Sequence, residues 1–378
     1  MERTIRSISL TASLLALAVV TGCAGAQKSE RVVWPFPPET PRIQYVRSIA
    51  SSRDVEAGFR RFWSQLSGKK ALSLFNPTGL ALSPDERRLY VACVSASNIL
   101  VFDLEKGTVE RAANVEGYRP TSPWSVAVDG SGNLYVGDQA ERLVWVYSAD
   151  GKFLRQIGKG MFERPAGVAF DRRRQLLYVV DGSNGESMRH RVEVFAPDGR
   201  HLRTIGSRGD GPGQFNFPSY AAVAPDGKLY VADTGNFRIE VFDPEGAFVT
   251  MVGAVGEGPG QFGKAKGMAF DAFGNLYVVD GQVGYVQIFN PDLRPLMFFG
   301  GLAERPEFMK MPNAIAIDSK NNIYVADYMM NHVNQYALVN TKAADAQAQS
   351  APAPSPGGDK RPQPSTSSPP SPAADPQR

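Results

Sequence analysis

A short phrase of leucine or isoleucine, tyrosine and valine recurs six times along the chain. Its tyrosines are 43 to 52 residues apart, namely Tyr90, Tyr135, Tyr178, Tyr230, Tyr277 and Tyr324. Around each phrase, apolar and polar residues alternate in short segments that are separated by Gly, Asp and Asn. Such period-two segments with tight-turn residues predict β-hairpins rather than helices. A unit of about 45 residues with four strands is typical of a propeller blade.

The repeat count therefore predicts an all-β fold, a six-bladed β-propeller of four-stranded antiparallel blades over residues 43–340. The sixth unit ends its third strand at Tyr336 and has no fourth strand before the C-terminal tail. The segment Ile43–Ile49 has the pattern of the outer strand His201–Gly206. We expect this N-terminal strand to pair with the last blade, close the ring and protect an edge.

Residues 1–22 have the pattern of a lipoprotein signal peptide. Arg3 and Arg6 precede an apolar stretch that is too short to span a bilayer. The run Val20-Thr21-Gly22-Cys23 resembles a bacterial lipobox, which implies that Cys23 is acylated and anchors the chain in a lipid bilayer. An aspartate directly after the cysteine would resemble a signal for retention in the inner membrane. This chain has Ala24 there, which favours the outer membrane of a bacterial cell envelope.

Residues 23–42 read as a lipid anchor followed by a proline-rich, extended tether. Its aromatic residues, Trp34 and Phe36, are expected on the edge of the propeller, with the membrane interface as the alternative. Residues 341–378 hold nine of the 28 prolines and no Val, Ile, Leu, Met or aromatic residue. That tail has too little apolar surface to offset the entropy of ordering, so we predict that it is disordered.

An insertion at about residues 52–68 departs from the strand pattern. Its apolar residues recur at helical spacing, namely Val55, Phe59, Phe62, Trp63 and Leu66. Ser51 or Ser52 is a candidate N-cap, and Gly68 is a candidate end. One interpretation is a helix that packs over a propeller face. The other is a helix that docks on the membrane surface or on a partner, because its flanks are basic.

Composition agrees with a folded domain between two unusual termini. The chain is 43% hydrophobic, and its 41 Lys and Arg against 38 Asp and Glu give a net charge of only +3. No strong field therefore recruits nucleic acid. Two cysteines make no disulfide framework. If Cys23 is acylated, Cys93 is the remaining thiol, and its place at a strand end predicts a small buried side chain.

The most specific runs of the sequence are Gly209–Phe215, its echo Gly256–Phe262, and Asp233–Ile239. Through them the chain resembles NHL-repeat propellers over roughly residues 43–340. Together with the lipobox and the proline-rich spacer, it is similar to a group of bacterial six-bladed propeller lipoproteins. Blade one departs from the pattern with Cys93 where the other blades carry an aspartate, and blade five lacks the Asn-x-Arg element.

Two recurring features of the blades are interpreted as structural. The glycine runs lack the Lys-Ser/Thr of a phosphate-binding loop and no helix follows them, so we read them as connections between blades. An aspartate ends the second strand of five blades, and these are Asp138, Asp181, Asp233, Asp280 and Asp327. We expect them to cap the loops that follow, with Asn236 and Arg238 as partners in blade four. Cation binding is the alternative.

Alignment of the first strands predicts a ring of residues at the mouth of the central channel. It comprises Thr78, Trp124, Ala166, Ser219, Lys266 and Asn313. Lactonase-like propellers hold calcium near the axis with carboxylates and amides, and this ring has no carboxylate. The amidating-lyase relatives use a histidine-bound zinc. Here the three histidines, His190, His201 and His332, are spread over different strands. We therefore predict no metal, cofactor or catalytic residue.

These features predict a membrane-anchored envelope lipoprotein whose propeller is a scaffold for a protein or glycan partner, without catalysis. Candidate contacts of the binding face are Trp124, Tyr220, Lys266, Asn313, Tyr328 and His332. The alternative is that Trp124 and Tyr220 plug the channel. The alternative function is a metal-dependent hydrolase or lyase of the lactonase-like or amidating-lyase type. A third option, suggested only by the resemblance, is an accessory of an envelope redox or secretion complex.

Overall fold

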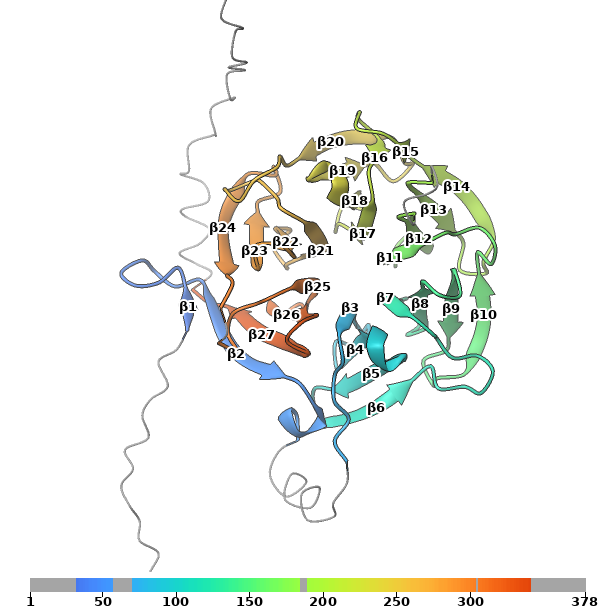
Figure 1. The fold of residues 1–378 in the computed structure, drawn as a ribbon, viewed down its shortest axis with the longest axis horizontal. Coiled ribbons are helices and arrows are strands. Elements are labelled where there is room, and N and C mark those ends of the chain that lie inside the picture. The colour runs from blue at the N-terminus through green and yellow to red at the C-terminus, as the bar shows by residue number, and fades with distance from the viewer. Residues whose placement is uncertain (1–31, 57–69, 184–188, 304, 341–378) are drawn as a thin grey trace, which may run out of the picture.

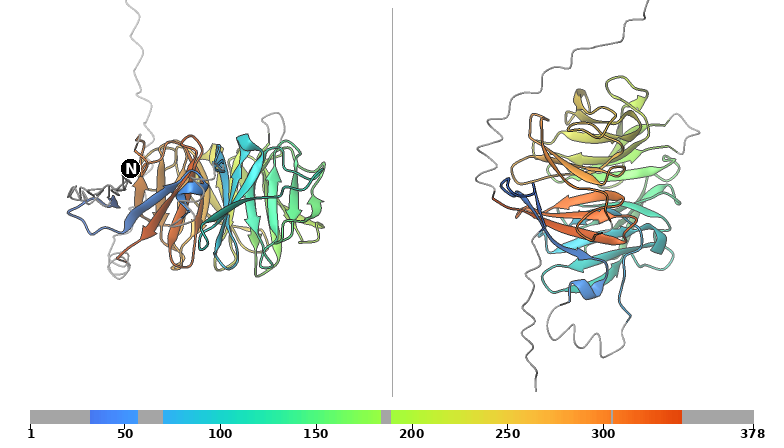
Figure 2. Two further views of the ribbon diagram at one scale, coloured as in Figure 1. Left: turned by 90° about the horizontal axis from the view of Figure 1, so that it is seen from below. Right: turned by 60° about the vertical axis from the view of Figure 1, so that its left-hand side comes forward.

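The computed structural model describes residues 32–56, 70–183, 189–303 and 305–340. They form six antiparallel sheets arranged around a central axis, and each sheet is one blade (Figure 1). Seen from the side, the blades make a flat disc (Figure 2). The predicted all-β, six-bladed propeller is therefore confirmed. The predicted signal peptide, Cys23 and the C-terminal tail lie outside the described residues. Within those ranges no helix is long and apolar enough to cross a bilayer.

The blades follow one another along the chain, each from an inner strand at the axis to an outer strand at the rim. Blade one consists of β3 (Pro77–Leu82), β4 (Arg88–Cys93), β5 (Asn98–Asp103) and β6 (Thr108–Ala112). Blade two consists of β7 (Pro123–Val128), β8 (Leu134–Asp138), β9 (Leu143–Tyr147) and β10 (Phe153–Ile157). Blade three consists of β11 (Pro165–Asp171), β12 (Leu176–Asp181), β13 (Arg191–Phe195) and β14 (His201–Ile205).

Blades four and five are joined to their neighbours by the glycine-rich runs. Blade four consists of β17 (Pro218–Val223), β18 (Leu229–Asp233), β19 (Arg238–Phe242) and β20 (Phe248–Val252). Blade five consists of β21 (Ala265–Phe270), β22 (Leu276–Asp280), β23 (Tyr285–Phe289) and β24 (Pro295–Gly300). Between blades three and four, β15 (Ser207–Arg208) and β16 (Gln214–Phe215) form a short parallel pair.

Blade six joins the two ends of the propeller. From the chain's C-terminal part come β25 (Pro312–Ile317), β26 (Asn322–Asp327) and β27 (His332–Leu338), and β2 (Ile43–Ile49) pairs antiparallel with β27. The expected closure by the N-terminal strand is confirmed. The structure adds a fifth strand, β1 (Val33–Trp34), that the sequence pattern did not predict. Trp34 is buried there against Phe299 and Tyr336. This part of the predicted tether is therefore packed on the edge of the propeller.

The two faces of the disc carry different connections. We call one face of the disc the upper face. It carries the loops between second and third strands and the connections between successive blades. The lower face carries the turns between first and second strands and between third and fourth strands. A first strand therefore runs from the upper face, where its proline lies, to the lower face. Predicted ring residues such as Trp124 consequently lie near the upper face.

The repeated tyrosine of a blade packs at the seam with the next blade. The ring centroid of Tyr135 lies 5.1 Å from that of Phe170 in blade three. The Tyr135 hydroxyl donates to the Asp129 carboxylate at 3.2 Å, within its own hairpin turn. Tyr277 and Asp271 repeat this contact in blade five. In blades two and five the tyrosine thus fills the apolar gap at the seam and also satisfies its hydroxyl.

Small residues on the inner strands let neighbouring blades approach closely. A Cβ on Gly167 of β11 would lie 2.8 Å from the carbonyl oxygen of Ser219 and 2.9 Å from the Cα of Tyr220. Both contacts are to backbone, which has no room to move aside. The glycine is therefore required for β11 and β17 to lie this close to each other at the axis.

The insertion after β2 begins with a single 3-10 turn, η1 (Ser52–Asp54). The Asp54 carboxylate accepts hydrogen bonds from the backbone N–H groups of Ala50 and Ser51, at 2.9 and 2.7 Å. Val55 is buried. Residues 57–69, which include the predicted helical positions Phe59, Phe62, Trp63 and Leu66, lie outside the described residues, so the two interpretations of the insertion stay predictions.

Candidate functional site

Tyr220 closes the upper end of the central channel. It belongs to β17 of blade four, and its hydroxyl donates to the carbonyl oxygen of Thr78 in blade one, 2.6 Å away. The side chains of Asn313 and Trp124 hydrogen-bond to the same hydroxyl. Burial raises the pKa of Tyr220 far above its ordinary value, so the hydroxyl keeps its proton. Residues from four blades thus meet at one oxygen atom.

The other polar members of the predicted ring join neighbouring blades. The Thr78 hydroxyl donates to the carbonyl oxygen of Pro123 at 3.2 Å, across the seam between blades one and two. The Asn313 amide donates to the Thr78 carbonyl at 3.3 Å, across the seam between blades six and one. Ser219 and Thr234 share a hydrogen bond of 2.5 Å, and Thr234 donates to the Ala265 carbonyl of blade five. These side chains are committed to holding the ring together.

A positively charged cluster lies beside this plug. Arg164, which precedes the first strand of blade three, stacks over the ring of Trp124 at 5.7 Å. Its charge also acts on Lys266 of β21. Burial, together with the neighbouring charges of Lys264 and Arg164, lowers the pKa of Lys266 to about 8. The two neighbouring charges that act on Lys266 are thus both positive. We call Arg164, Lys264, Lys266 and Trp124 the cationic cluster.

Two of the predicted contacts lie apart from this cluster: Tyr328 is in the loop between β26 and β27, and His332 is the first residue of β27. The Tyr328 carbonyl accepts a hydrogen bond from Asn76 at 2.9 Å. His332 is buried with 6% of its surface exposed, and burial lowers its pKa below the ordinary value while Asp327 raises it. The structure thus brings Trp124, Tyr220 and Asn313 into one network and Lys266 beside it, whereas Tyr328 and His332 have other neighbours.

The five aspartates at the ends of second strands are fully buried and accept hydrogen bonds from backbone N–H groups. Asp327 shows the pattern: it accepts from Lys310 and Met311 of the connection before its blade, and from Met329 and Met330 of the loop after it. The same type of connection is bound by Asp138, Asp181, Asp233 and Asp280. Each aspartate thus ties a between-blade connection to the end of a second strand.

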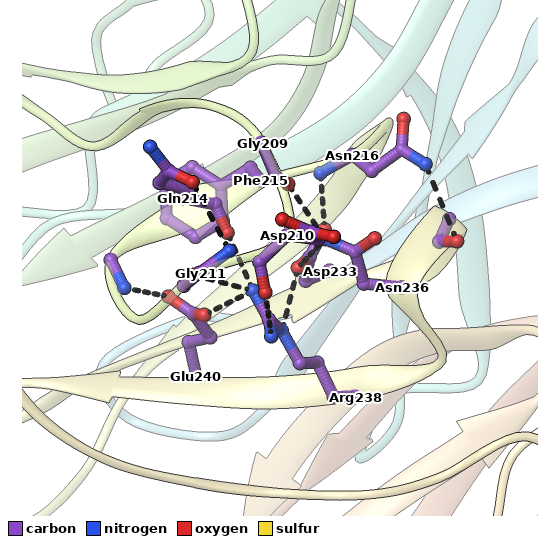
Figure 3. Close-up of polar contacts among 12 residues, drawn as sticks. Gly209, Asp210, Gly211, Gln214, Phe215, Asn216, Asp233, Asn236, Arg238 and Glu240 are labelled. Atoms are coloured by element: carbon purple, nitrogen blue, oxygen red, sulfur yellow. Dashed lines mark hydrogen bonds and ion pairs between the residues drawn. The ribbon is translucent and has the colours of Figure 1, made fainter.

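In blade four the aspartate is part of a larger buried network (Figure 3). Asp233 accepts hydrogen bonds from the Asn236 amide at 2.7 Å and from the Arg238 guanidinium at 2.9 Å. Arg238 also forms an ion pair with Glu240 at 2.7 Å. Burial raises the pKa of Glu240 to about 7, although the charge of Arg238 opposes this shift. Two buried carboxylates therefore share one buried guanidinium.

The same arginine holds the glycine-rich connection between blades three and four. Arg238 donates to the carbonyl oxygens of Asp210, Gly211 and Gln214, at 2.6 to 2.8 Å. The Glu240 carboxylate accepts from the N–H of Gly213 (Figure 3). In the second glycine run, Gln287 occupies the position that corresponds to Glu240. Its side-chain oxygen accepts a hydrogen bond from the N–H of Gly260 at 2.9 Å. The N–H groups of these runs therefore bind protein side chains rather than presenting a cradle for phosphate.

The histidines and the thiol have separate environments. His190 contacts the backbone of Phe215 and Phe217, and His201 contacts the Glu193 carboxylate at 2.7 Å. Over residues 32–56, 70–183, 189–303 and 305–340, no three His, Cys, Asp or Glu residues gather in a group that fits a metal ion. Cys93 is fully buried, and burial raises the pKa of its thiol to about 11, which keeps it protonated.

The sequence predicts a binding ring at one mouth of the channel, whereas the structure has a cavity at the other end. A cavity of about 430 Å³ lies on the axis and is lined by the lower ends of the first strands of all six blades. It opens on the lower face, opposite the predicted binding ring. Arg172 lies at its mouth, in the turn after β11. Neither Arg172 nor Arg164 is predicted from the sequence, where their one distinguishing feature is a position at either end of a first strand.

The family comparisons divide the chain into two matched parts. Residues 69–183 match the SMP-30/Gluconolactonase/LRE-like region, and residues 215–242 match the NHL repeat. NHL repeat-containing protein 2 of Gallus gallus is 27% identical over 42% of this chain, and NHL repeat-containing protein 3 of Mus musculus is 29% identical over 30% of it. The matches span only 20% and 39% of the lengths of these two relatives.

Solved structures show the same fold at low identity. A gluconolactonase from Xanthomonas campestris is 19% identical with a TM-score of 0.54, covering 70% of this chain and 86% of that one. Virginiamycin B lyase from Staphylococcus aureus is 14% identical with a TM-score of 0.51, covering 70% and 95%. With the repeats and the six blades, these findings define the class: the chain is a six-bladed β-propeller, similar to the SMP-30/gluconolactonase region in one part and to the NHL repeat in another.

Proposed function

We propose that this protein is a lipid-anchored envelope lipoprotein whose propeller binds a protein or glycan partner through the cationic cluster, without catalysis. The observation that carries the proposal is the stacking of Arg164 on Trp124, with Lys266 close to the Arg164 charge, at the upper end of the channel. An arginine stacked on a tryptophan is the kind of anchor that dominates binding energy in protein interfaces. The partner group that fits this cluster is an acidic one.

Electrostatics give the reason for an acidic group. The lowered pKa of Lys266 shows that its positive charge is disfavoured where it lies, because solvent is excluded and two further cations are close. A carboxylate or sulfate placed among the three cations relieves that repulsion and restores the charge of Lys266. The cluster disfavours a calcium ion, because calcium needs several oxygen ligands, some of them negatively charged, and the cluster supplies positive charge.

The tether supports the membrane part of the proposal. Val33 of β1, where the chain joins the propeller, lies ten positions after Cys23. At about 3.5 Å per residue, an extended segment of that length keeps the propeller within about 35 Å of an acylated Cys23. Growth of the source bacterium with an alkyne-labelled fatty acid tests the anchor. Label is expected on the wild-type chain and not on Cys23→Ser; equal labelling of both chains contradicts it.

Site-specific photocrosslinking tests the binding face. A photoreactive amino acid at Lys264, the exposed member of the cationic cluster, leaves Arg164 and Lys266 in place and is expected to capture a discrete partner in intact cells. Capture should fall at least tenfold when Lys266→Gln is added. The control carries the photoreactive residue at Phe273, an exposed position in a turn of the lower face. Capture at Phe273 equal to that at Lys264, or capture that is indifferent to Lys266→Gln, overturns the proposal.

The match to the SMP-30/gluconolactonase region over residues 69–183 favours one other function, a metal-dependent hydrolase or lyase. Metal analysis of the purified protein separates the two. A calcium or zinc ion that is held at one per chain through extensive dialysis, together with hydrolysis of a simple sugar lactone that a chelator abolishes, establishes the enzyme. Absence of tightly held metal, with partner capture at Lys264, supports the scaffold.

A further inference from the structure

Apolar side chains are exposed at the seam between blades five and six, beside the strand where the tether joins the propeller. Phe36, Phe298 and Leu302 are 55%, 47% and 61% exposed. Phe36 follows β1, Phe298 belongs to the outer strand β24, and Leu302 lies in the connection from β24 to blade six. Figure 1 places β1 and β24 on the same side of the disc. Single exposed apolar residues are ordinary on a protein surface, whereas a continuous patch marks an interaction surface.

Aromatic rings connect Phe36 to the body of the propeller. Its ring centroid lies 6.0 Å from that of Trp34, and the Trp34 ring lies 6.0 Å from that of Phe308, which precedes β25 of blade six. Trp34 is buried and Phe308 is half-buried. The exposed ring of Phe36 therefore continues inward as packed apolar surface.

The same Phe308 ring adjoins residues of blade five. A Cβ on Gly301, the residue before Leu302, would lie 3.5 Å from Phe308 and 3.6 Å from Tyr285. Tyr285 is half-buried and packs on Phe298, with 5.0 Å between the ring centroids. The exposed residues are thus joined through aromatic neighbours. We call this set the seam patch: Phe36, Tyr285, Phe298, Leu302 and Phe308.

The outer strand beside this patch also lacks charge. Neither β24 nor the neighbouring β20 contains a charged residue. In contrast, the outer strands β6, β10 and β14 of blades one to three each contain an arginine, namely Arg111, Arg155 and Arg203. In blade six, β2 contains Arg47, whose Nε donates to the Gln335 side chain at 2.8 Å. Charged residues normally keep an edge strand away from other surfaces, so β24 has an apolar edge without that protection.

The charges beside the patch balance one another among the described residues. Arg305 stacks over the Phe308 ring at 5.9 Å and forms an ion pair with Glu307. Lys310 and Glu39 are exposed and of opposite sign. A patch without net charge gains its binding energy by covering apolar area, so it has no preference for an anionic surface.

We propose that the seam patch rests on the lipid bilayer, with Phe36, Phe298 and Leu302 among the lipid headgroups. This inference rests on the lipid anchor of the proposed function. Val33 of β1 lies ten positions after Cys23, so an acylated Cys23 holds this part of the rim near the bilayer. The tether makes docking an intramolecular step, for which a few apolar side chains are sufficient. Contact through the rim keeps both faces of the disc, including the cationic cluster, open to a partner.

Photocrosslinking to lipid tests this contact. The chain from residue 23 onward, which includes every described residue, is coupled through the Cys23 thiol to a maleimide-bearing lipid in phosphatidylcholine vesicles. Cys93 is fully buried and does not compete for the maleimide. Benzoylphenylalanine is placed at Phe36 or Phe298, or at the controls Leu154 and Leu202, which are exposed on the outer strands of blades two and three.

Mass spectrometry should find phospholipid attached at Phe36 and Phe298 at least tenfold more than at Leu154 and Leu202. Addition of phosphatidylglycerol to the vesicles should leave this ratio unchanged, since the patch has no net charge. Equal attachment at all four positions, or none at Phe36 and Phe298, overturns the proposal. In intact cells, capture of a protein and no phospholipid at Phe298 also overturns it, whether that protein is a partner or a second copy of this chain.

A variant of the third exposed residue locates the contact. Leu302→Glu should lower lipid attachment at Phe298 at least fivefold, because a carboxylate is disfavoured among apolar side chains at the bilayer. Leu154→Glu is the matched control and should leave attachment unchanged. Melting curves identify a variant that fails to fold, and the comparison of probe positions on the otherwise unmodified chain then still decides. Unchanged attachment in folded Leu302→Glu contradicts the proposal.

The chemical anchor separates this inference from the proposed function. Coupling to the maleimide lipid replaces acylation, so lipid attachment at the patch does not depend on whether cells acylate Cys23. Absence of fatty-acid label on Cys23 in cells refutes the anchor alone. A labelled Cys23 without lipid attachment at Phe36 and Phe298 refutes the seam patch and leaves the anchor in place.

Discussion

The hydroxyl of Tyr220 donates a hydrogen bond to the carbonyl oxygen of Thr78, 142 residues away in the chain and across the axis of the propeller. This contact closes the channel from above and links blade four to blade one. Trp124 and Asn313 interact with the same hydroxyl, so its loss removes polar contacts in a buried place.

Tyr220→Phe is therefore expected to lower the free energy of unfolding by about 1–3 kcal/mol, the cost of leaving buried donors and acceptors unpaired. Urea denaturation followed by tryptophan fluorescence measures this. Tyr328→Phe is the matched control, since Tyr328 is half-buried and its hydroxyl contributes nothing to the plug. Equal stability of the two variants would show that the plug is energetically unimportant.

Trp34→Ala is expected to destabilise the propeller by about 3–5 kcal/mol, in the range of large aromatic truncations in a core. Trp34 is only 4% exposed and packs against aromatic rings of blades five and six. Thermal denaturation provides the measurement. The control is Phe36→Ala, because Phe36 is 55% exposed and its truncation should cost less than about 1 kcal/mol. A small effect of Trp34→Ala would contradict a closing role for β1.

Glu240 predicts a pH dependence of stability. Its pKa is raised from 4.5 to about 7 in the folded protein, so between these values the folded state binds more protons than the unfolded state. Stability contributed by this group is thus present at low pH and is lost as the pH rises through about 4.5 to 7.

The test is Glu240→Gln, which keeps an acceptor for Gly213, as Gln287 does for Gly260 in blade five. From pH 4.5 to 7, the wild-type protein should lose stability relative to Glu240→Gln. Denaturant titrations of both proteins at several pH values give the difference. A constant difference over this range would mean that Glu240 does not titrate there.

Lys266 is expected to react as an unusually acidic amine, because its pKa of about 8 leaves about half of it uncharged at pH 8. Limited acetylation followed by mass spectrometry should show labelling of Lys266 that rises with a midpoint near pH 8. Lys228 is the comparison, since its ion pair with Asp226 raises its pKa above the ordinary value. Labelling of Lys266 that parallels Lys228 would contradict the lowered pKa.

The repeat pattern predicted most of the fold because its causes are local. Alternating polarity and turn residues determine each hairpin, and the recurring tyrosine fills each seam, so Tyr135 and Tyr277 make the same contact in different blades. The closing strand β2 was predictable for the same reason: a sixth blade without an outer strand and an N-terminal strand without a blade complete each other.

The sites were predicted less well because they depend on contacts across the ring. Trp124, Tyr220 and Asn313 were expected to gather near the axis, but whether they present a surface or plug the channel depends on side-chain directions that no spacing encodes. The structure shows Tyr220 as a plug. Arg164 and Arg172 were missed, since their roles come from neighbours in other blades.

By itself, the sequence determined the number of blades, their order and the strand that closes the ring, because hydrophobic periodicity and turn chemistry act over a few residues. Only the tertiary structure decided that the upper end of the channel is filled and that the lower end is open. Bringing six first strands together around one axis places residues up to 235 positions apart in contact, as Thr78 and Asn313 show. The packing of their side chains at that axis is a property of the closed ring and of no single repeat.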